Sequence, residues 1–157
     1  MKRSPWWSNG VRFACQPDCG ACCDQPGGVV FLSRRDIARL AARAGLSESE
    51  YLDRDCTTSQ NGRLVLKSRP EDGICIYLDG QKRCAVYEDR PQQCAAFPWW
   101  QENLASRRSW SKVRQACPGL TASDAVLIEG DVIRLHVEAD RQSSMGVRRP
   151  LPPLEED

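Results

Sequence analysis

The sequence predicts a small, irregular α+β domain with short helices and strands, stapled by a metal bound to cysteine. Three observations predict it: the chain has 157 residues, it contains nine cysteines, and only 7% of its residues are aromatic. A domain of this length buries roughly 70% of the surface that its unfolded chain exposes. Because ten prolines and eleven glycines interrupt modest apolar runs, we expect metal–thiolate bonds to supplement the core.

The N-terminal segment predicts little regular structure. Residues 1–12 are polar apart from two tryptophans, and we expect a flexible arm. The next segment, 13–28, places its cysteines among prolines and glycines and therefore on turns. The apolar run 29–32 then predicts a short buried strand.

Two helices follow, each with a capping signal. Ser33 and Asp36 form the first capping box, and Gly45 marks the end of that helix. Ser47 and Glu50 form a second box, which opens a shorter helix.

The middle of the chain favours short strands. Residues 64–66 and 74–78 are apolar, and a turn signal at residues 79–80 suggests a hairpin that places Cys84 across from Cys75.

The C-terminal part predicts further short helices. Pro91 favours a helical turn that carries Cys94, and Ser109 favours a helix that ends at Cys117. Residues 131–141 fit either a helix or a strand, and helix is favoured. We expect one metal-binding domain over residues 13–142 and a disordered tail over residues 143–157.

Charge and hydropathy exclude several classes of partner. With 22 basic and 21 acidic residues, the net charge of +1 gives no field that would attract nucleic acid. No apolar run approaches the ~18 residues of a membrane span or the length of an export signal. We therefore expect a cytoplasmic protein that binds neither nucleic acid nor membrane. Reduced thiols are expected there, although disulfides remain the competing explanation for the cysteines.

The first cysteine cluster has metal-ligand spacing. Cys15, Cys19 and Cys22 are separated by three and two residues, so a short loop can direct their sulfurs at one centre. Cys23 is different, because adjacent side chains diverge. Cys22 and Cys23 therefore suggest two metals, two irons of one cluster, or one ligand beside a packed thiol.

A second set of cysteines, spaced more widely, completes eight thiols that suit two four-coordinate sites or one iron–sulfur cluster. Its members are Cys75, Cys84, Cys94 and Cys117. Cys56 and the single histidine, His136, are expected to lie outside the metal site.

The motifs together resemble a bacterial cysteine-cluster family, the YkgJ-like or CxxCxxCC domain. The resemblance covers residues 13–120 and is carried by Phe13-x-Cys15-x3-Cys19-Gly20-x-Cys22-Cys23, Cys75-x2-Leu78, Cys84-x2-Tyr87-Glu88-x-Arg90-Pro91-x2-Cys94-x2-Phe97-Pro98 and Cys117-Pro118-Gly119. It implies chelation of zinc or iron by Cys15, Cys19, Cys22, Cys23, Cys75, Cys84, Cys94 and Cys117. Cys56 has no place in the pattern.

These observations predict a metal-binding protein of redox or metal-handling character. An iron–sulfur cluster or iron is favoured over zinc, since adjacent cysteines suit a polynuclear centre better than a single ion. A redox or protein partner is compatible with this function. Two alternatives stay open: an iron-dependent oxidoreductase or protein-modifying enzyme in which Cys23 or Cys56 reacts, and a zinc-stapled protein-interaction module.

Overall fold

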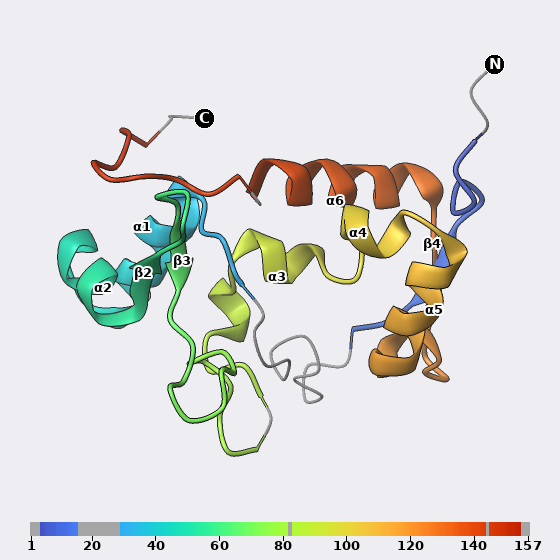
Figure 1. Cartoon of the computed structure of the whole chain (residues 1–157). Coiled ribbons are helices and arrows are strands. Elements are labelled where there is room, and N and C mark those ends of the chain that lie inside the picture. Colours follow the sequence, from blue (N-terminus) through green and yellow to red (C-terminus); the bar gives the residue numbers. More distant parts are fainter. Residues whose placement is uncertain (1–3, 16–28, 82, 144, 155–157) are drawn as a thin grey trace.

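The computed structural model has an α+β architecture, as the sequence predicts. It describes residues 4–15, 29–81, 83–143 and 145–154. Within these ranges, helices surround two small antiparallel sheets, each made of two strands. Figure 1 shows two groups of elements, with α3 (Gln92–Ala96) between them and α6 (Gly130–Ser143) running along α3.

The first group is built on the two predicted capped helices, and both capping boxes are confirmed. Ser33 and Asp36 cap α1 (Arg34–Ala44), which ends at Gly45 in the left-handed conformation with φ of 71°. Ser47 and Glu50 cap α2 (Glu48–Asp55). Each box satisfies backbone N–H groups that the first helical turn leaves without partners.

A hairpin covers these helices and closes the first hydrophobic cluster. Strand β2 (Cys56–Thr58) pairs with β3 (Leu64–Leu66), the strand that the sequence predicts. The buried cluster between helices and hairpin contains Leu32, Ile37, Leu40, Ala41, Tyr51, Leu52, Cys56, Leu64 and Leu66.

The segment 29–32 contributes to this cluster without forming the predicted strand. Phe31 makes an isolated bridge with Val65, and Leu32 is fully buried. The backbone of Val147, in the segment expected as a tail, donates to the Leu32 carbonyl at 3.1 Å and accepts from Leu64 N–H at 2.8 Å. These separate contacts, rather than a continuous ladder, satisfy the backbone here.

The second group is rich in tryptophan. Strand β1 (Val11–Phe13) pairs with β4 (Val126–Ile128), a sheet that sequence patterning did not predict. It packs with α4 (Gln101–Leu104), α5 (Arg107–Ala116), the 3-10 turn η2 (Pro118–Leu120) and α6. Their buried cluster contains Trp7, Trp99, Leu104, Trp110, Cys117, Leu120 and Ile133.

Aromatic stacking organises this second cluster. Trp99 and Trp110 stack with ring centroids 5.6 Å apart, and Trp6 lies against Trp110 at 5.5 Å. Trp6 therefore attaches the N-terminal segment, and Trp110 attaches α5, to one apolar centre.

The C-terminal helices and the loop after β3 agree only in part with the sequence-based expectation. Residues 131–141 are helical, as favoured, within α6. The N-cap of helix α5 lies three residues before the predicted one, because Ser106 rather than Ser109 accepts the capping hydrogen bond. In the middle of the chain, no strand forms over 74–78: Cys84 bridges Leu78, and Cys75 bridges Ser68. The predicted opposition of Cys75 and Cys84 is therefore wrong.

Among the described residues, no helix has both the length and the apolar character needed to cross a membrane.

Candidate metal centre

The loop that follows β3 carries Cys75 and Cys84 on consecutive turns. The Leu78 N–H donates to the Cys75 carbonyl at 3.1 Å, and the Tyr87 N–H donates to the Cys84 carbonyl at 3.2 Å. A bond of 2.7 Å from Ala85 N–H to the Tyr77 carbonyl joins the two turns. Both cysteines thus lie on locally closed backbone, and both are partly buried.

Cys94 lies on α3, which is fixed to α1 by a buried carboxylate. Asp36 is 1% exposed and belongs to the capping box of α1. It also accepts a hydrogen bond from Gln92 N–H at 3.0 Å and an ion pair from Arg39 at 2.9 Å. Charge-assisted bonds of this kind are among the stronger ones in proteins. The first turn of α3, and Cys94 with it, is therefore positioned by α1.

Arg39 extends this connection to the 3-10 turn η1 (Tyr87–Asp89), which lies between Cys84 and Cys94. Its guanidinium donates to the carbonyls of Asp89 at 3.3 Å and Arg90 at 2.9 Å. Arg43 forms an ion pair with Asp89 at 3.1 Å. Helix α1 thereby orients the whole segment from Cys84 to Cys94.

Cys117 and Cys15 come from the second group and lie on neighbouring backbone. Cys117 is the C-cap of α5 and is 6% exposed. Two residues further on, the Gly119 carbonyl accepts from Ala14 N–H at 3.0 Å. A Cβ atom on Gly119 would lie 2.4 Å from the Ala14 oxygen. Glycine is therefore required for the close approach that places Cys15 near Cys117.

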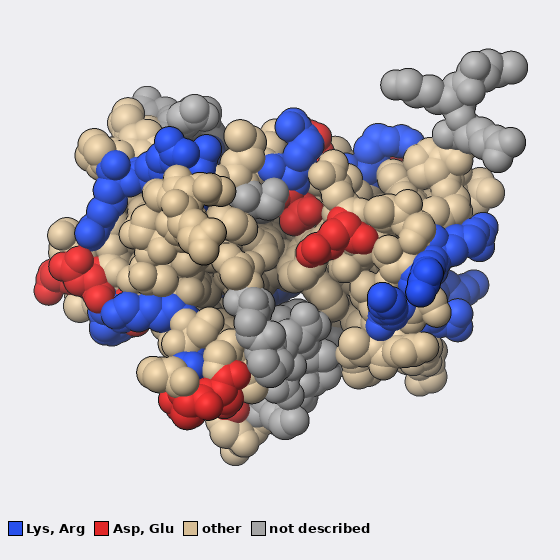
Figure 2. Space-filling model, viewed as in Figure 1, with Lys and Arg blue, Asp and Glu red and all other residues tan. Residues whose placement is uncertain are grey.

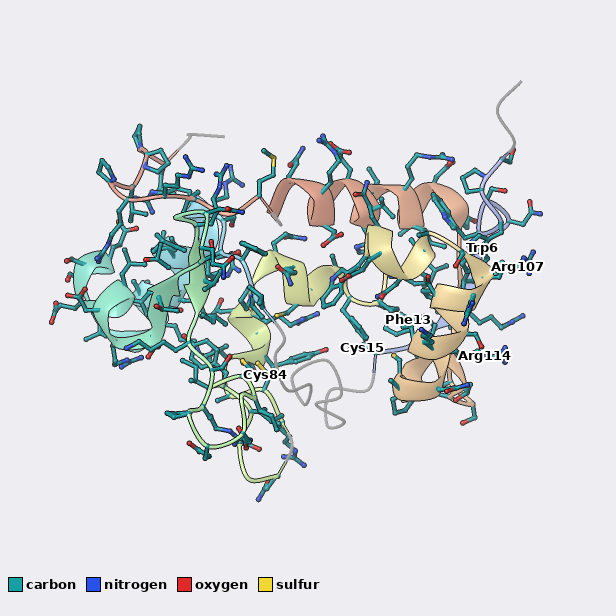
Figure 3. All side chains as sticks on the ribbon, viewed as in Figure 1. Trp6, Phe13, Cys15, Cys84, Arg107 and Arg114 are labelled. Carbon is teal, nitrogen blue, oxygen red and sulfur yellow. The ribbon has the colours of Figure 1, made fainter. Side chains whose placement is uncertain are left out.

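One contact joins the two groups of cysteines directly. The Cys15 sulfur lies 3.2 Å from the hydroxyl of Tyr87, three residues after Cys84. Figure 3 labels Cys15, beside α5, and Cys84, on the loop next to the segment that leads into α3. The described end of the first cysteine cluster thus touches the segment that carries the second set.

The described chain resumes after the first cluster at Val29, where a side chain next to Cys94 holds it. The Gln93 side chain, 8% exposed, accepts from Phe31 N–H at 3.0 Å and donates to the Val29 carbonyl at 2.9 Å. Gln93 is the sequence neighbour of Cys94. The described residues that flank 16–28, Cys15 and Val29, therefore contact Tyr87 and the side chain of Gln93, the neighbour of Cys94.

Cys19, Cys22 and Cys23 lie outside the described residues. Among the residues that the structure describes, no group of three histidine, cysteine or acidic side chains forms a metal site. The convergence of all eight predicted ligands therefore stays a prediction.

Cys56 lies inside the first hydrophobic cluster. It is 5% exposed, and burial, assisted by the nearby Asp55 charge, raises the pKa of its thiol to about 12. A thiol that stays protonated at neutral pH is a poor ligand and a poor nucleophile. This environment disfavours the alternative in which Cys56 reacts.

His136 lies in an aromatic environment on α6. Its ring stacks on Trp99 with centroids 6.5 Å apart, and burial lowers the pKa of the imidazole. A neutral, stacked imidazole fits its packing position in the second cluster.

The helix that leads to Cys117 is basic. Helix α5 contains exposed Arg107, Arg108, Lys112 and Arg114 and no acidic residue. Figure 2 shows lysine and arginine gathered over this side of the molecule. A centre of several thiolates is anionic, and cations close to such a centre reduce the electrostatic cost of assembling it.

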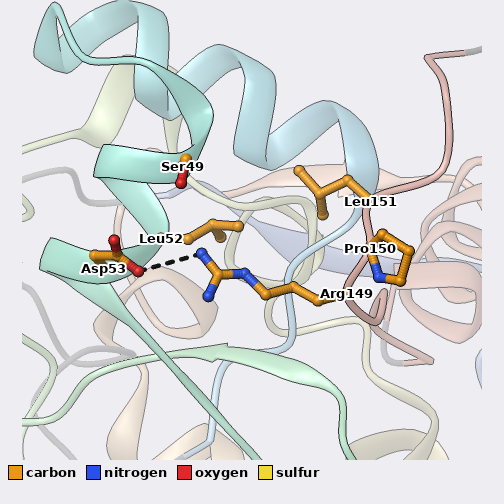
Figure 4. A pocket seen from close by; sticks show the side chains of 6 residues that line it. All are labelled: Ser49, Leu52, Asp53, Arg149, Pro150 and Leu151. Atoms are coloured by element: carbon orange, nitrogen blue, oxygen red, sulfur yellow. Dashed lines mark hydrogen bonds and ion pairs between the residues drawn. The ribbon is translucent and has the colours of Figure 1, made fainter.

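The surface hollow between α2 and residues 149–151 is separate from the cysteines. It has a volume of about 690 Å³ and is lined by Ser49, Leu52, Asp53, Arg149, Pro150 and Leu151. Figure 4 shows the ion pair between Asp53 and Arg149, at 3.3 Å, inside it. This lining contains no thiol.

Sequence reasoning missed the residues that position the cysteines. Tyr87 stood in a recognised motif, but nothing in the sequence linked it with Cys15. Gln93 and Gly119 gave no signal, because their roles depend on contacts 62 or more residues away along the chain.

Both groups of elements carry described cysteines, and Cys15 of the second group contacts Tyr87, three residues after Cys84. Residues 14–118 match the family model CxxCxxCC, which is described as "Putative zinc- or iron-chelating domain". The match covers more than half of the chain. The protein therefore belongs to this family, as its motifs indicated. No solved structure matches the chain.

Proposed function

We propose that the protein binds zinc or iron through two sets of cysteines that the fold brings together. The ligands are Cys15, Cys19, Cys22, Cys23, Cys75, Cys84, Cys94 and Cys117. The observation that carries this proposal is that the described residues on either side of 16–28 both contact the part of the chain that carries Cys84 and Cys94. The contact between Cys15 and Tyr87, and the two bonds from Gln93, limit how far the first cluster can lie from the second.

The donor set fits such a metal. Thiolates are the preferred protein ligands of zinc and of iron–sulfur clusters. The described members Cys75, Cys84 and Cys94 are partly buried, and Cys15 is exposed. A metal bound by these cysteines would be shielded from solvent on one side and accessible on the other. Bound zinc would supply structural cross-linking, and an iron–sulfur cluster would supply one-electron redox chemistry.

Iron in a cluster is the favoured form, with a redox or metal-handling role in the cytoplasm. The reason is the adjacency of Cys22 and Cys23. Neighbouring side chains diverge, so binding both sulfurs to a single tetrahedral ion would strain the backbone. In a cluster the two sulfurs can bind two different irons.

Purification without oxygen, followed by elemental analysis and visible spectroscopy, tests the proposal. A brown protein with stoichiometric iron and sulfide and broad visible absorption supports the cluster. Stoichiometric zinc without colour supports chelation but overturns the cluster. If neither metal co-purifies or can be reconstituted, metal binding itself is wrong.

Single substitutions identify the ligands. Cys19→Ser and Cys84→Ser, one from each set, should each lower the metal content and the thermal stability together. Retention of full metal content by either variant would remove that cysteine from the site.

A further inference from the structure

We infer that Tyr87 is a positioning residue of the metal centre, whose hydroxyl donates a hydrogen bond to the metal-bound thiolate of Cys15. This inference rests on the proposed function. The Tyr87 oxygen and the Cys15 sulfur are 3.2 Å apart, and in the protonated state either atom can be the donor. A thiolate bound to a metal has no proton to donate. Metal binding therefore fixes the direction of the bond, from the hydroxyl to the sulfur.

Three contacts hold Tyr87, two on its backbone and one on its ring. Its N–H donates to the Cys84 carbonyl at 3.2 Å, and its carbonyl accepts from Arg90 at 2.9 Å. The guanidinium carbon of Arg90 lies 4.2 Å from the centre of the Tyr87 ring. Tyr87 is thus oriented before metal binds, and the hydroxyl does not have to be ordered at that step.

Arg90 itself is tied to the first group. Its carbonyl accepts from Arg39 of α1 at 2.9 Å, and Arg39 pairs with buried Asp36. The hydroxyl that contacts Cys15 is therefore positioned by α1, although Cys15 belongs to the segment that pairs with Gly119 in the second group.

The hydrogen bond from Tyr87 changes how the Cys15 sulfur binds the metal. A hydrogen bond withdraws electron density from the thiolate and so weakens its donation to the metal. The cation over the ring strengthens the hydroxyl as a donor. Among the described cysteines of the predicted set, Cys15 is the exposed one, so water competes most readily for this ligand. Tyr87 keeps the Cys15 sulfur in place against that competition.

Tyr87→Phe tests the inference, because it removes the hydroxyl and keeps the ring under Arg90. The probe is Co²⁺ loaded into the apo protein without oxygen, followed by transfer of the ion to a chromogenic chelator. We expect the sulfur-to-cobalt charge-transfer band to move to lower energy, since the sulfur becomes a stronger donor. We also expect Co²⁺ release to become about tenfold faster, in line with the loss of other groups that orient metal ligands.

Tyr51→Phe is the matched control. The Tyr51 hydroxyl also makes a short side-chain bond, 2.6 Å from the Tyr77 hydroxyl, inside the first cluster. Its loss should leave the charge-transfer band and the release rate unchanged, even if stability falls.

A double-mutant cycle with Cys15→Ser separates a metal effect from a general loss of stability. In the Cys15→Ser background, Tyr87→Phe should no longer shift the band or accelerate release. If wild-type protein binds Co²⁺ but Tyr87→Phe leaves both readouts unchanged, or shifts them equally in the Cys15→Ser background, the inference is wrong and the proposed function stands. If wild-type protein binds none of Co²⁺, Zn²⁺ and iron, the proposed function fails.

Discussion

Cys56 illustrates how the environment of one residue decides its chemistry. Its thiol lies beside Tyr51, whose hydroxyl bonds to Tyr77, and Tyr77 donates to Asp55 at 2.9 Å. Burial raises the pKa values of both phenols as well. This network satisfies polar groups inside an apolar cluster, and it stabilises neutral forms of the thiol and the phenols.

Cys56→Ala should lower the unfolding free energy at pH 7.5 by about 1–2 kcal/mol, the ordinary effect of a small core truncation, without loss of metal. The pH dependence gives a sharper test. The native thiol has a pKa of about 12, whereas an unfolded thiol titrates near ~8.5. Between these values the unfolded state binds fewer protons, so stability falls as pH rises.

The wild-type protein should therefore lose more stability than Cys56→Ala between pH 7.5 and pH 10.5. Urea unfolding at several pH values measures the difference, and Tyr51 and Tyr77 are present in both proteins. Identical slopes would show that the Cys56 thiol is not perturbed by burial.

At the scale of elements, backbone approaches position the cysteines as much as side chains do. The pairing of Ala14 with Gly119 connects β1 to η2 and places Cys15 near Cys117. It depends on the absence of a side chain at Gly119, where a Cβ atom would also lie 2.8 Å from the Phe13 ring. A single methyl group is therefore enough to disturb this side of the candidate centre.

Gly119→Ala should destabilise the protein by about 1–3 kcal/mol, as overpacking does elsewhere, and should reduce metal content because Cys15 is displaced. Gly80→Ala is the matched control, since a Cβ atom there meets no other atom within 4 Å. Thermal unfolding and elemental analysis of both variants measure the effect. Equal behaviour of the two variants would mean that the approach at Gly119 does not position Cys15.

At the scale of the whole molecule, two small hydrophobic clusters share one chain. The first contains no tryptophan, whereas Trp7, Trp99 and Trp110 are buried in the second. Helix α3 lies between the groups and packs on α6 of the second group (Figure 1), and the predicted ligands come from both groups. A metal bound by both sets would therefore couple the unfolding of the two clusters.

Removal of the metal by an anaerobic chelator should lower the unfolding free energy by several kcal/mol. It should also separate two urea transitions that coincide in the metal-bound protein. Tryptophan emission follows the second cluster, and amide exchange in α1 follows the first. Coincident transitions before and after chelation would show that packing alone couples the clusters.

Local chemistry explains which parts of the fold were predictable. The capping boxes at Ser33 and Ser47 and the apolar run 64–66 depend on residues within a few positions, and each forms as expected. The sheet of β1 and β4 joins segments more than 110 residues apart, and its three-residue strands carry too little periodicity for detection. The hairpin predicted for Cys75 and Cys84 was wrong because tight turns use the same residues that mark hairpin loops.

The sequence by itself determined the family, the cysteine inventory and the two capped helices, because these follow from residue identity and short spacing. Only the tertiary structure decided that Tyr87 meets Cys15, that Gln93 anchors Val29 and that Cys56 is buried among tyrosines. Such contacts depend on how two separate clusters are brought together. That arrangement is set by packing and by buried polar bonds such as those of Asp36, which no local pattern encodes.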